Sequence, residues 1–189
     1  MEHSSNLYIA LLHYPVYNKK GDVVTTAVTN MDVHDISRTA RTYGVQRFFI
    51  VTPLAQQRNF VKGILNHWQR GYGAVYNPSR KTAFDIVETR TSLGDVITDI
   101  ALSTGKRVLL VATSAVARLD NTSFQTISDG ITKNEDNYVL LFGTGWGIAE
   151  EVIQRADYML EPIRGMPDYN HLSVRSAVAI VMDRLAGHR

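Results

Sequence analysis

The sequence predicts an α/β protein with a largely parallel β-sheet flanked by helices, in a single domain over residues 1–189. Two observations lead to this prediction. Short apolar runs alternate with helix-like patterns along the chain, which is typical of parallel strands joined by crossover helices. The chain also contains no linker, repeat or low-complexity segment, and its 189 residues, 44% of them hydrophobic, can bury one sizeable core.

Each element follows from its own pattern. The strands are predicted from apolar or β-branched runs and lie at 7–13, 23–29, 46–52, 83–88, 107–113, 138–144 and 158–163. The helices are predicted from apolar residues at helical spacing and lie at 32–44, 54–68, 92–105, 121–133, 149–156 and 173–187. In the first helix, for example, Val33, Ile36 and Ala40 share one face between an acidic start at Asp32 and a stop at Gly44. A segment rich in turn residues, 70–81, is expected to be irregular.

The composition narrows the class of protein. The chain has no cysteine, which excludes disulfides, thiol catalysis and a cysteine-bound zinc site, and which fits a cytoplasmic setting. No stretch approaches the roughly 18 apolar residues that span a bilayer, so no membrane partner is expected. A net charge of +2 permits a nucleic-acid partner without demanding one. No histidine pair or carboxylate cluster indicates a metal site, so none is expected.

The stretch LLFGTGWGIAEEVI, residues 140–153, places Gly143, Gly145 and Gly147 directly after an apolar run. Glycines between a strand and a helix let a ligand approach backbone N–H groups. The spacing departs from the dinucleotide pattern G-x-G-x-x-G, because Ile148 stands where the third glycine belongs, and no P-loop signature is present. A tight turn that needs positive φ is the alternative, but Trp146 between two glycines favours a ligand or partner.

Two further loops follow apolar runs in the C-terminal half. ATSA, residues 112–115, ends one run, and a Pro- and Gly-rich segment, 160–174, leads into the last helix. Ligands of parallel sheets bind in the loops at the carboxyl ends of the strands. The loops therefore predict one site, in which Tyr169, Asn170 and His171 either cap the last helix or hydrogen-bond a polar ligand.

In this order, the loops resemble the SPOUT superfamily of S-adenosylmethionine (SAM)-dependent RNA methyltransferases. HLSVRSAVAI, residues 171–180, is similar to the last family motif, S-L-N-V-S followed by an apolar helix. DVHDISRTARTYGV, residues 32–45, is similar to the first, N-x-x-N-I-x-R-T-A. The likeness covers nearly the whole chain and, with LLHYPVYNK and FGTGWG, is close to a bacterial subfamily sometimes fused to the tRNA guanine-N1 methyltransferase.

The resemblance implies that the loops form a deep trefoil knot, through which the last helix threads, and that SAM binds among them. The donor site implied in this way consists of Thr113 at its rim and of Leu141, Phe142, Gly143, Gly145, Ile163, Gly165 and Leu172. Gly145→Val is then expected to abolish donor binding with little loss of folding. A homodimer is also implied, and the apolar residues of the last helix are taken as its support: Val174, Ala177, Val178, Val181 and Leu185.

The acceptor implied by the resemblance is tRNA or rRNA, methylated at a ribose 2′-hydroxyl. By motif position Arg38 is the catalytic arginine. Because a guanidinium is a poor base, we expect it to clamp a phosphate and to stabilise developing charge. A base-nitrogen acceptor would instead need a carboxylate, for which Asp168 is the candidate.

Four positions depart from the motifs. Asp32 and Asp35 stand where the ribose-methylating branch has Asn, Ser173 stands in an Asn place and Arg175 in a Ser place. A donor site built mainly from backbone groups should survive these changes. The assignment of the acceptor as a ribose hydroxyl depends on these four positions more strongly than the donor site does.

Three residues outside the loops are candidate RNA contacts. Arg41 and Arg80 would extend a phosphate track, with solvated surface side chains as the alternative. His13 closes the first strand, and a hydrogen-bonded, partly buried histidine is its alternative. Two other functions stay open, namely an oxidoreductase that binds NAD at the glycine loop and a catalytically silent RNA-binding module.

Overall fold

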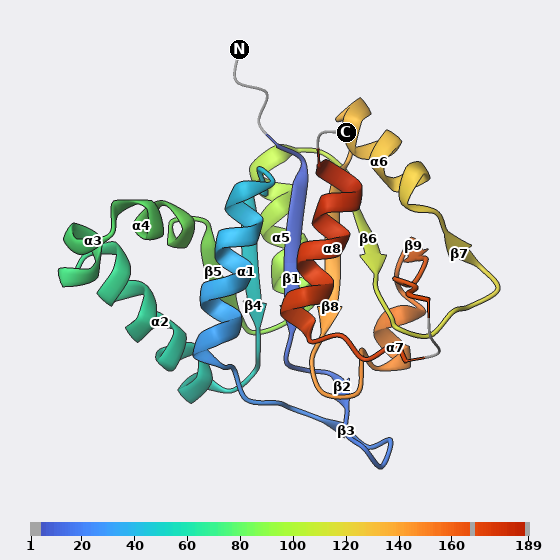
Figure 1. Cartoon of the computed structure of the whole chain (residues 1–189), viewed down its shortest axis with the longest axis horizontal. Helices are drawn as coiled ribbons and strands as arrows, with labels where there is room; N and C mark the ends of the chain where they lie inside the picture. The colour runs from blue at the N-terminus through green and yellow to red at the C-terminus, as the bar shows by residue number, and fades with distance from the viewer. Residues whose placement is uncertain (1–4, 167–168, 188–189) are drawn as a thin grey trace.

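The structure, a computed structural model, describes residues 5–166 and 169–187. A seven-stranded sheet has the order β5-β4-β1-β8-β6-β9-β7, and its strands all run parallel (Figure 1). Its strands are β1 (Leu7–Leu12), β4 (Arg47–Val51), β5 (Val87–Arg90), β6 (Val108–Ala112), β7 (Asn121–Thr122), β8 (Asn137–Gly143) and β9 (Tyr158–Leu160). A separate antiparallel hairpin pairs β2 (Val16–Tyr17) with β3 (Val23–Val24). The predicted parallel α/β architecture is confirmed.

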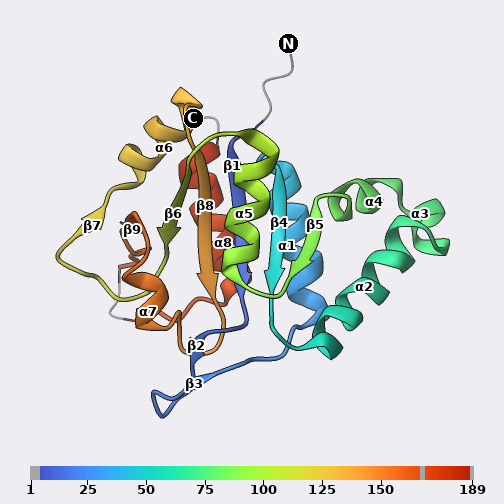
Figure 2. The ribbon, with the colours of Figure 1, turned by 180° about the vertical axis from the view of Figure 1, so that it is seen from behind.

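Helices cover both faces of the sheet. They are α1 (Asn30–Thr42), α2 (Ala55–Gln69), α3 (Tyr72–Tyr76), α4 (Pro78–Phe84), α5 (Leu93–Thr104), α6 (Phe124–Lys133), α7 (Glu150–Ile153) and α8 (Val174–Ala186). Helices α1 and α8 lie side by side on one face, and α5 and α7 lie on the other (Figures 1 and 2). The described helices include none that is long and apolar enough to cross a membrane.

The central strands are apolar on both faces because both faces are covered. In β1, Leu7, Ile9 and Leu11 belong to the core beneath α1 and α8, while the alternate residues belong to the core beneath α5 and α7. The six residues of β1 are all buried. A continuous apolar run was therefore the correct sign of a parallel strand at the centre of the sheet.

The helix boundaries follow from capping residues. The side chain of Thr29 accepts a hydrogen bond from the backbone N–H of Asp32 and begins α1. Ser92 and Asp95 form a reciprocal capping box at the start of α5, and Gly105, with φ of 67°, ends that helix. Both helices were predicted within two residues of these boundaries.

Four predicted segments differ from the structure. The helix predicted from residue 121 begins only at Phe124, because Asn121 and Thr122 form β7 and Ser123 caps the helix. Residues 70–81, expected to be irregular, contain α3 and the start of α4, which Asn77 caps and Pro78 begins. The strand predicted from residue 83 begins only at Val87, because Ala83 and Phe84 finish α4. The β-branched run 23–29 forms only the two-residue strand β3, and the rest of it is extended chain that leads to α1.

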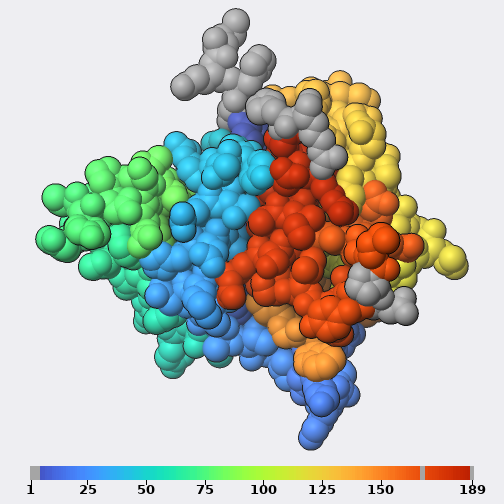
Figure 3. Space-filling model, in the orientation of Figure 1, coloured from blue at the N-terminus to red at the C-terminus, as the bar shows by residue number. Residues whose placement is uncertain are grey.

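The β2–β3 hairpin and the loops after β6, β8 and β9 gather at one edge of the sheet. Helices α1 and α8 both begin at this carboxyl edge and run back along the sheet (Figure 1). On the surface, α1 and α8 form a continuous face, and the hairpin projects below it (Figure 3). The edge is where a parallel sheet is expected to bind its ligand.

Candidate functional site

The three predicted loops follow three neighbouring strands. Strand β6 pairs with β8 on one side and with β9 on the other, so the loops that leave their carboxyl ends are neighbours. The hydroxyl of Thr113 donates to the carbonyl of Leu141 at 2.8 Å. The side-chain amide of Asn170 donates to the carbonyl of Ala115 at 3.0 Å, which joins the third loop to the first. The predicted convergence of these loops is confirmed by these contacts.

An ion pair also joins the first loop to the helix after the glycine loop. The two terminal nitrogens of Arg118 contact the two carboxylate oxygens of Glu150, at 3.0 and 2.5 Å. The hydrogen bonds from Arg118 lower the pKa of Glu150. Sequence analysis missed this pair, because the two residues are 32 positions apart and belong to different predicted elements.

Glycine is required at the three positions of this loop for different physical reasons. A Cβ on Gly143 would lie 2.7 Å from Cγ1 of Ile148, so close packing excludes a side chain there. Gly145 has φ of 60°, and a Cβ on it would lie 2.7 Å from the carbonyl oxygen of Tyr17. Gly147 has φ of 109° and open space beside it. Only the third glycine therefore leaves room for another molecule, and the tight-turn interpretation holds for part of the loop.

The β2–β3 hairpin is hydrogen-bonded to the glycine loop through Tyr17. Trp146 donates its backbone N–H to the carbonyl of Tyr17 at 2.9 Å, and Tyr17 donates to the carbonyl of Gly147 at 2.9 Å. The Tyr17 hydroxyl accepts a hydrogen bond from the backbone N–H of Glu150 at 3.1 Å. Gly145→Val would disturb this contact, so the expectation of little loss of folding is wrong on steric grounds. Sequence analysis missed Tyr17 because it lies in a segment without periodicity.

The third loop leaves backbone groups unpaired. Glu161 donates its N–H to the carbonyl of Thr122 at 2.9 Å and accepts from the N–H of Phe124 at 2.8 Å. After it, the N–H groups of residues 163–166, which include Ile163 and Gly165, donate to no other described residue. Ile163 is half-buried, whereas Gly165 and Leu172 are exposed. Free backbone donors on an exposed loop are suited to a polar ligand.

The other predicted donor-site residues contribute through their backbone or their edge position. Leu141 and Phe142 are fully buried in the sheet, each on a different face, so their side chains belong to the core. Thr113 is half-buried at the loop edge, as expected of a rim residue. Trp146 is 60% exposed beside the glycines. Asp168 lies outside the described residues.

His13 does not form part of a surface. Its side chain is fully buried at the end of β1, so the prediction of an RNA contact is wrong and the buried, hydrogen-bonded alternative is correct. Thr144 donates its hydroxyl hydrogen to the carbonyl of Leu12 at 3.0 Å, so the hydroxyl hydrogen of Thr26 goes either to Thr144, at 2.5 Å, or to the carbonyl of His13, at 3.4 Å. Thr26 then accepts from Nδ1 of His13 at 3.1 Å.

This direction leaves Nε2 of His13 unprotonated, and Nε2 has no hydrogen-bond partner among the described residues. Burial lowers the pKa of His13 to about 4, against a smaller opposing effect of Asp32. The imidazole is therefore neutral at physiological pH and acts as a fixed support between the first strand and the glycine loop.

Three of the four departures from the family motifs contact one another. Arg175, in the first turn of α8, reaches the carboxylate of Asp32 at 2.9 Å and that of Asp35 at 3.3 Å. Asp32 is 8% exposed on its side chain and also accepts from the hydroxyl of Thr29 at 2.6 Å. The changes are thus complementary, because two carboxylates on α1 accompany one guanidinium on α8.

The predicted acceptor residues lie along α1 and beyond it. Arg38 is exposed, makes no ion pair with a described residue, and lies about 9 Å along the axis from Asp32, toward the opposite edge of the sheet. Arg41 is exposed one turn further on. Arg80 lies on α4, with its guanidinium 4.5 Å from the centre of the Trp68 ring. Within one chain, none of these arginines has a recorded contact with the glycine loop.

Comparison with known proteins identifies the family. A family profile described as SAM-dependent RNA methyltransferase matches residues 6–187. The chain belongs to this family. The family match agrees with the resemblance seen in the sequence, and it gives no support to the NAD-dependent alternative.

Sequence relatives of this methyltransferase cover almost all of the chain. It is 43% identical over 182 residues to a tRNA (guanine-N(1)-)-methyltransferase of Oleidesulfovibrio alaskensis, a match that covers 96% of this chain and 42% of the relative. It is 41% identical over 182 residues to an uncharacterized protein of Aquifex aeolicus, covering 96% and 89%. The chain therefore spans about two fifths of the named relative and most of the other.

Solved structures share its fold. A putative methylase family protein from Neisseria gonorrhoeae has a TM-score of 0.65 at 15% identity, with 98% of this chain and 83% of that chain covered. The SpoU methyltransferase AviRb from Streptomyces viridochromogenes, in complex with the cofactor AdoMet, has a TM-score of 0.58 at 14% identity, with 98% and 58% covered. These likenesses show that the methyltransferase fold, and not only the sequence motifs, is present.

The residues at the carboxyl edge fit a SAM molecule. The open side of Gly147, the exposed ring of Trp146 and the unpaired N–H groups of residues 163–166 lie on neighbouring loops. Backbone donors suit the polar atoms of adenine and of the amino-acid portion, and an aromatic ring suits an apolar or cationic group. The site therefore has donors of the right kind for the cofactor of the family.

Proposed function

We propose that this methyltransferase transfers the methyl group of SAM to a ribose 2′-hydroxyl of tRNA or rRNA and that it acts as a homodimer. The observation that carries the proposal is the meeting of the loops after β6, β8 and β9, the third of which has backbone N–H groups that donate to no described residue. A tRNA or rRNA substrate places the reaction in the cytoplasm.

When bound, SAM would supply an electrophilic methyl group on its sulfonium, and the remainder of the molecule would be the leaving group, a neutral thioether. The task of the chain is to hold the donor and the acceptor close and in line. In the proposal, Thr113, Trp146, Gly147, Ile163, Gly165 and Leu172 surround the donor, and the backbone of Leu141 and Phe142 forms the floor. Gly143 and Gly145 act indirectly, because their lack of a side chain lets the loop pack against Ile148 and Tyr17. The network from His13 to Thr144 keeps the glycine loop in place from behind.

Arg38 acts on the RNA and not on the donor. It is exposed, it makes no ion pair with a described carboxylate, and it lies away from the glycine loop of its own chain. A second chain is therefore needed to bring it to the donor, which is the reason for proposing a homodimer. A guanidinium can bind a phosphate through two hydrogen bonds, a geometry that lysine cannot reproduce.

The apolar residues of the last helix do not support the dimer in the way that the sequence suggested. Val178, Val181 and Leu185 are buried in the core of their own chain, and Val174 and Ala177 are partly covered. The last helix thus has much less free apolar surface than its sequence suggested. The dimer proposal now depends on the position of Arg38.

The deep knot also belongs to the proposal. The third loop, which lies immediately before α8, contacts the first loop through Asn170 and Ala115. Arg175 at the start of α8 then contacts α1 through Asp32 and Asp35. These contacts support a path in which the last helix passes between the first loop and α1.

A base nitrogen is the second candidate acceptor. The name of the Oleidesulfovibrio relative, tRNA (guanine-N(1)-)-methyltransferase, motivates it, although this chain spans only 42% of that protein. Removal of the N1 proton of guanine would need a general base. Asp168 would be that base in this alternative.

Mass spectrometry of the modified nucleosides distinguishes the two acceptors. The purified chain is incubated with SAM and with tRNA or rRNA from a strain that lacks the gene, and the RNA is digested to nucleosides. We expect a 2′-O-methylated nucleoside. Loss of a charge-assisted contact made in the transition state costs about 2–4 kcal/mol, so Arg38→Lys and Arg38→Ala should each slow transfer roughly a hundredfold.

Two controls accompany this experiment. SAM affinity should be unchanged in both Arg38 variants, because the proposal gives Arg38 no contact with the donor. Arg107→Ala removes an exposed arginine at the opposite edge of the sheet and should leave the rate unchanged. A methylated base, an inactive Asp168→Asn and an active Arg38→Ala would together replace the ribose mechanism by the base-nitrogen mechanism.

A further inference from the structure

The segment that forms α2, α3 and α4 is strongly basic. Residues 55–84 contain Arg58, Lys62, Arg70, Arg80 and Lys81 and no Asp or Glu. The segment thus carries a charge of +5 while the whole chain carries +2, so the remainder of the chain is net acidic. None of these five cations forms an ion pair with a described carboxylate. The positive charge of the protein is therefore concentrated on one lobe.

Exposed aromatic rings accompany this charge. Phe60, Tyr72 and Tyr76 are 45%, 75% and 73% exposed. The rings of Tyr72 and Tyr76 stack with their centres 5.9 Å apart. The lobe forms the outer end of the molecule, next to α1 (Figure 3). Exposed aromatic and basic side chains together are characteristic of surfaces that bind single-stranded nucleic acid.

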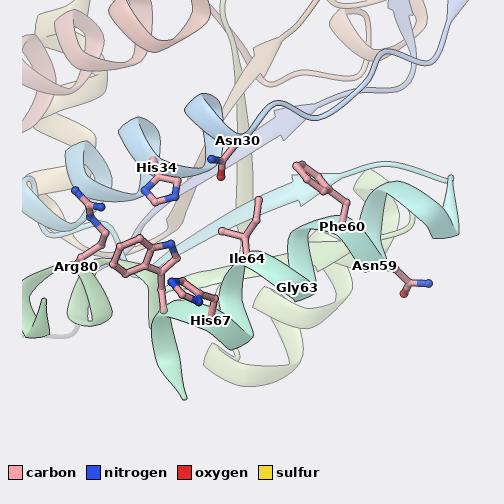
Figure 4. A pocket seen from close by; sticks show the side chains of 9 residues that line it. Asn30, His34, Asn59, Phe60, Gly63, Ile64, His67 and Arg80 are labelled. Carbon is pink, nitrogen blue, oxygen red and sulfur yellow. The ribbon is translucent and has the colours of Figure 1, made fainter. Parts of the chain in front are cut away.

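The lobe packs against α1 through α4, and a groove of about 650 Å³ opens between α1 and α2. Its walls include Asn30 and His34 from α1, Phe60, Ile64 and Trp68 from α2, and Arg80 from α4. Arg80 lies 4.5 Å above the centre of the Trp68 ring, and the His34 ring meets Trp68 edge to face at 5.4 Å. Figure 4 shows His34 and Asn30 facing Ile64 and Phe60 across the opening, with Arg80 at one end. Apolar walls with a few polar groups are typical of a small-ligand site.

We infer that this groove, between α1, α2 and α4, binds one unstacked base of a single-stranded RNA segment. The inference rests on the proposed function, since it concerns how the RNA substrate is held. Arg80 and Phe84 already cover the Trp68 ring, so the exposed Phe60 ring and the Arg80 guanidinium are the planes that stack on the base. Asn30 and His34 can hydrogen-bond the edge of the base. The exposed cations of the lobe, Lys62, Arg70 and Lys81, lie on the neighbouring α2 and α4 segments and hold the flanking phosphates.

The position of the groove links it to the reaction. His34 and Arg38 are one turn apart on α1, about 6 Å along the axis. A base held against His34 therefore brings the neighbouring phosphates and ribose of the same strand close to Arg38. The base in the groove orients the strand that Arg38 clamps.

Two other occupants fit the observations less well. A second copy of the chain would bring one +5 lobe against another, which is electrostatically unfavourable. An acidic peptide would satisfy the charge but would not explain a groove lined by the aromatic rings of Phe60 and Trp68. Charge and aromatic rings together favour RNA.

Gly63 offers a direct test, because it lines the groove and a Cβ on it would have no heavy atom within 4 Å. The Cβ of Gly63→Leu has open space, its isobutyl group adds bulk at the groove lining, and the variant should raise Tm because leucine favours a helix more than glycine does. Gly94→Leu is the matched control, since Gly94 is an exposed glycine of α5 on the other sheet face whose Cβ would meet only Ser92 Oγ at 3.5 Å.

The probe is a fluorescein-labelled, 15-nucleotide, single-stranded RNA of mixed sequence, with binding followed by fluorescence anisotropy. We expect Gly63→Leu to weaken binding at least tenfold and to raise KM for bulk tRNA, while the affinity for SAM stays normal. Gly94→Leu should bind like the parent. Equal affinities for Gly63→Leu and the parent would overturn the inference, as would tighter binding of a polyglutamate peptide or self-association through the lobe.

Tryptophan fluorescence gives a second readout. The chain has two tryptophans, so Trp146→Phe leaves Trp68 as the only emitter. Addition of the RNA should quench Trp68, and Gly63→Leu should abolish the quenching; unchanged emission would contradict the groove as the site. If the parent methylates RNA and Gly63→Leu does so equally well, only this inference fails. If the parent neither binds nor methylates RNA, the proposed function fails with it.

Discussion

At the residue scale, His13 shows how a polar side chain can serve a site without touching a ligand. It is fully buried, its Nδ1 donates to Thr26, and Thr26 in turn contacts Thr144 of the glycine loop. A charged imidazole would be poorly solvated at this position, so the pKa falls to about 4. The side chain couples the first strand and the hairpin to the loop that follows β8.

This pKa predicts a loss of stability in acid. The unfolded chain protonates His13 near pH 6.5, whereas the folded chain resists protonation down to about pH 4. The stabilising contribution is therefore complete above pH 6.5 and declines as the pH falls toward 4, by about 3 kcal/mol in total. Urea unfolding between pH 7.5 and roughly 4 should show this decline, and His13→Asn should flatten it in that range. An NMR titration in which His13 protonates near 6.5 would contradict the prediction.

At the element scale, Arg175 ties the start of α8 to α1. Asp32 is almost buried, so removing the guanidinium alone leaves a carboxylate with little compensation beyond Thr29. Asp35 is 52% exposed on its side chain, so its pair with Arg175 contributes little. The contact of Arg175 with Asp32 therefore dominates.

A double-mutant cycle measures this contact. Asp32→Asn and Arg175→Ser each restore the residue of the family motif, and each alone should destabilise the chain. Together they remove both charges, so the double variant should be more stable than the sum of the single effects by about 1–2 kcal/mol. Asp35→Asn, the control, should change the free energy of unfolding by less than about 0.5 kcal/mol. Additive single effects for Asp32 and Arg175 would show that the ion pair does not hold the helices together.

The elements also show which features the sequence could predict. Runs such as Leu7–Leu12 are buried on both faces, so their continuous apolar sequence was enough to predict parallel strands. The general rule that ligands bind after such strands then allowed the loops to be proposed as one site. The grip of Tyr17 on the glycine loop could not be foreseen, because it joins segments about 130 residues apart through backbone groups that carry no pattern. The burial of His13 and the pairing of Arg175 with α1 likewise depend on tertiary packing alone.

At the scale of the whole molecule, the proposed donor site and the proposed RNA-binding surface lie in different parts of the protein. The carboxyl edge gathers the loops that hold the donor in the proposal, and the basic lobe of α2, α3 and α4 lies beside α1, which carries Arg38. The net charge of +2 hides this division, because the basic lobe is balanced by an acidic remainder. A second chain would complete the site by bringing Arg38 to the donor loops.

The donor-binding and catalytic proposals depend on SAM binding among the loops after β6, β8 and β9, which calorimetry measures. Gly165→Val is the most informative variant, because Gly165 is exposed in the third loop and belongs to the proposed donor site. We predict one SAM per chain for the parent and for the control Gly94→Val, and at least tenfold weaker binding for Gly165→Val at an unchanged Tm. Undetectable binding by the parent, or equal affinity in Gly165→Val, would contradict the account.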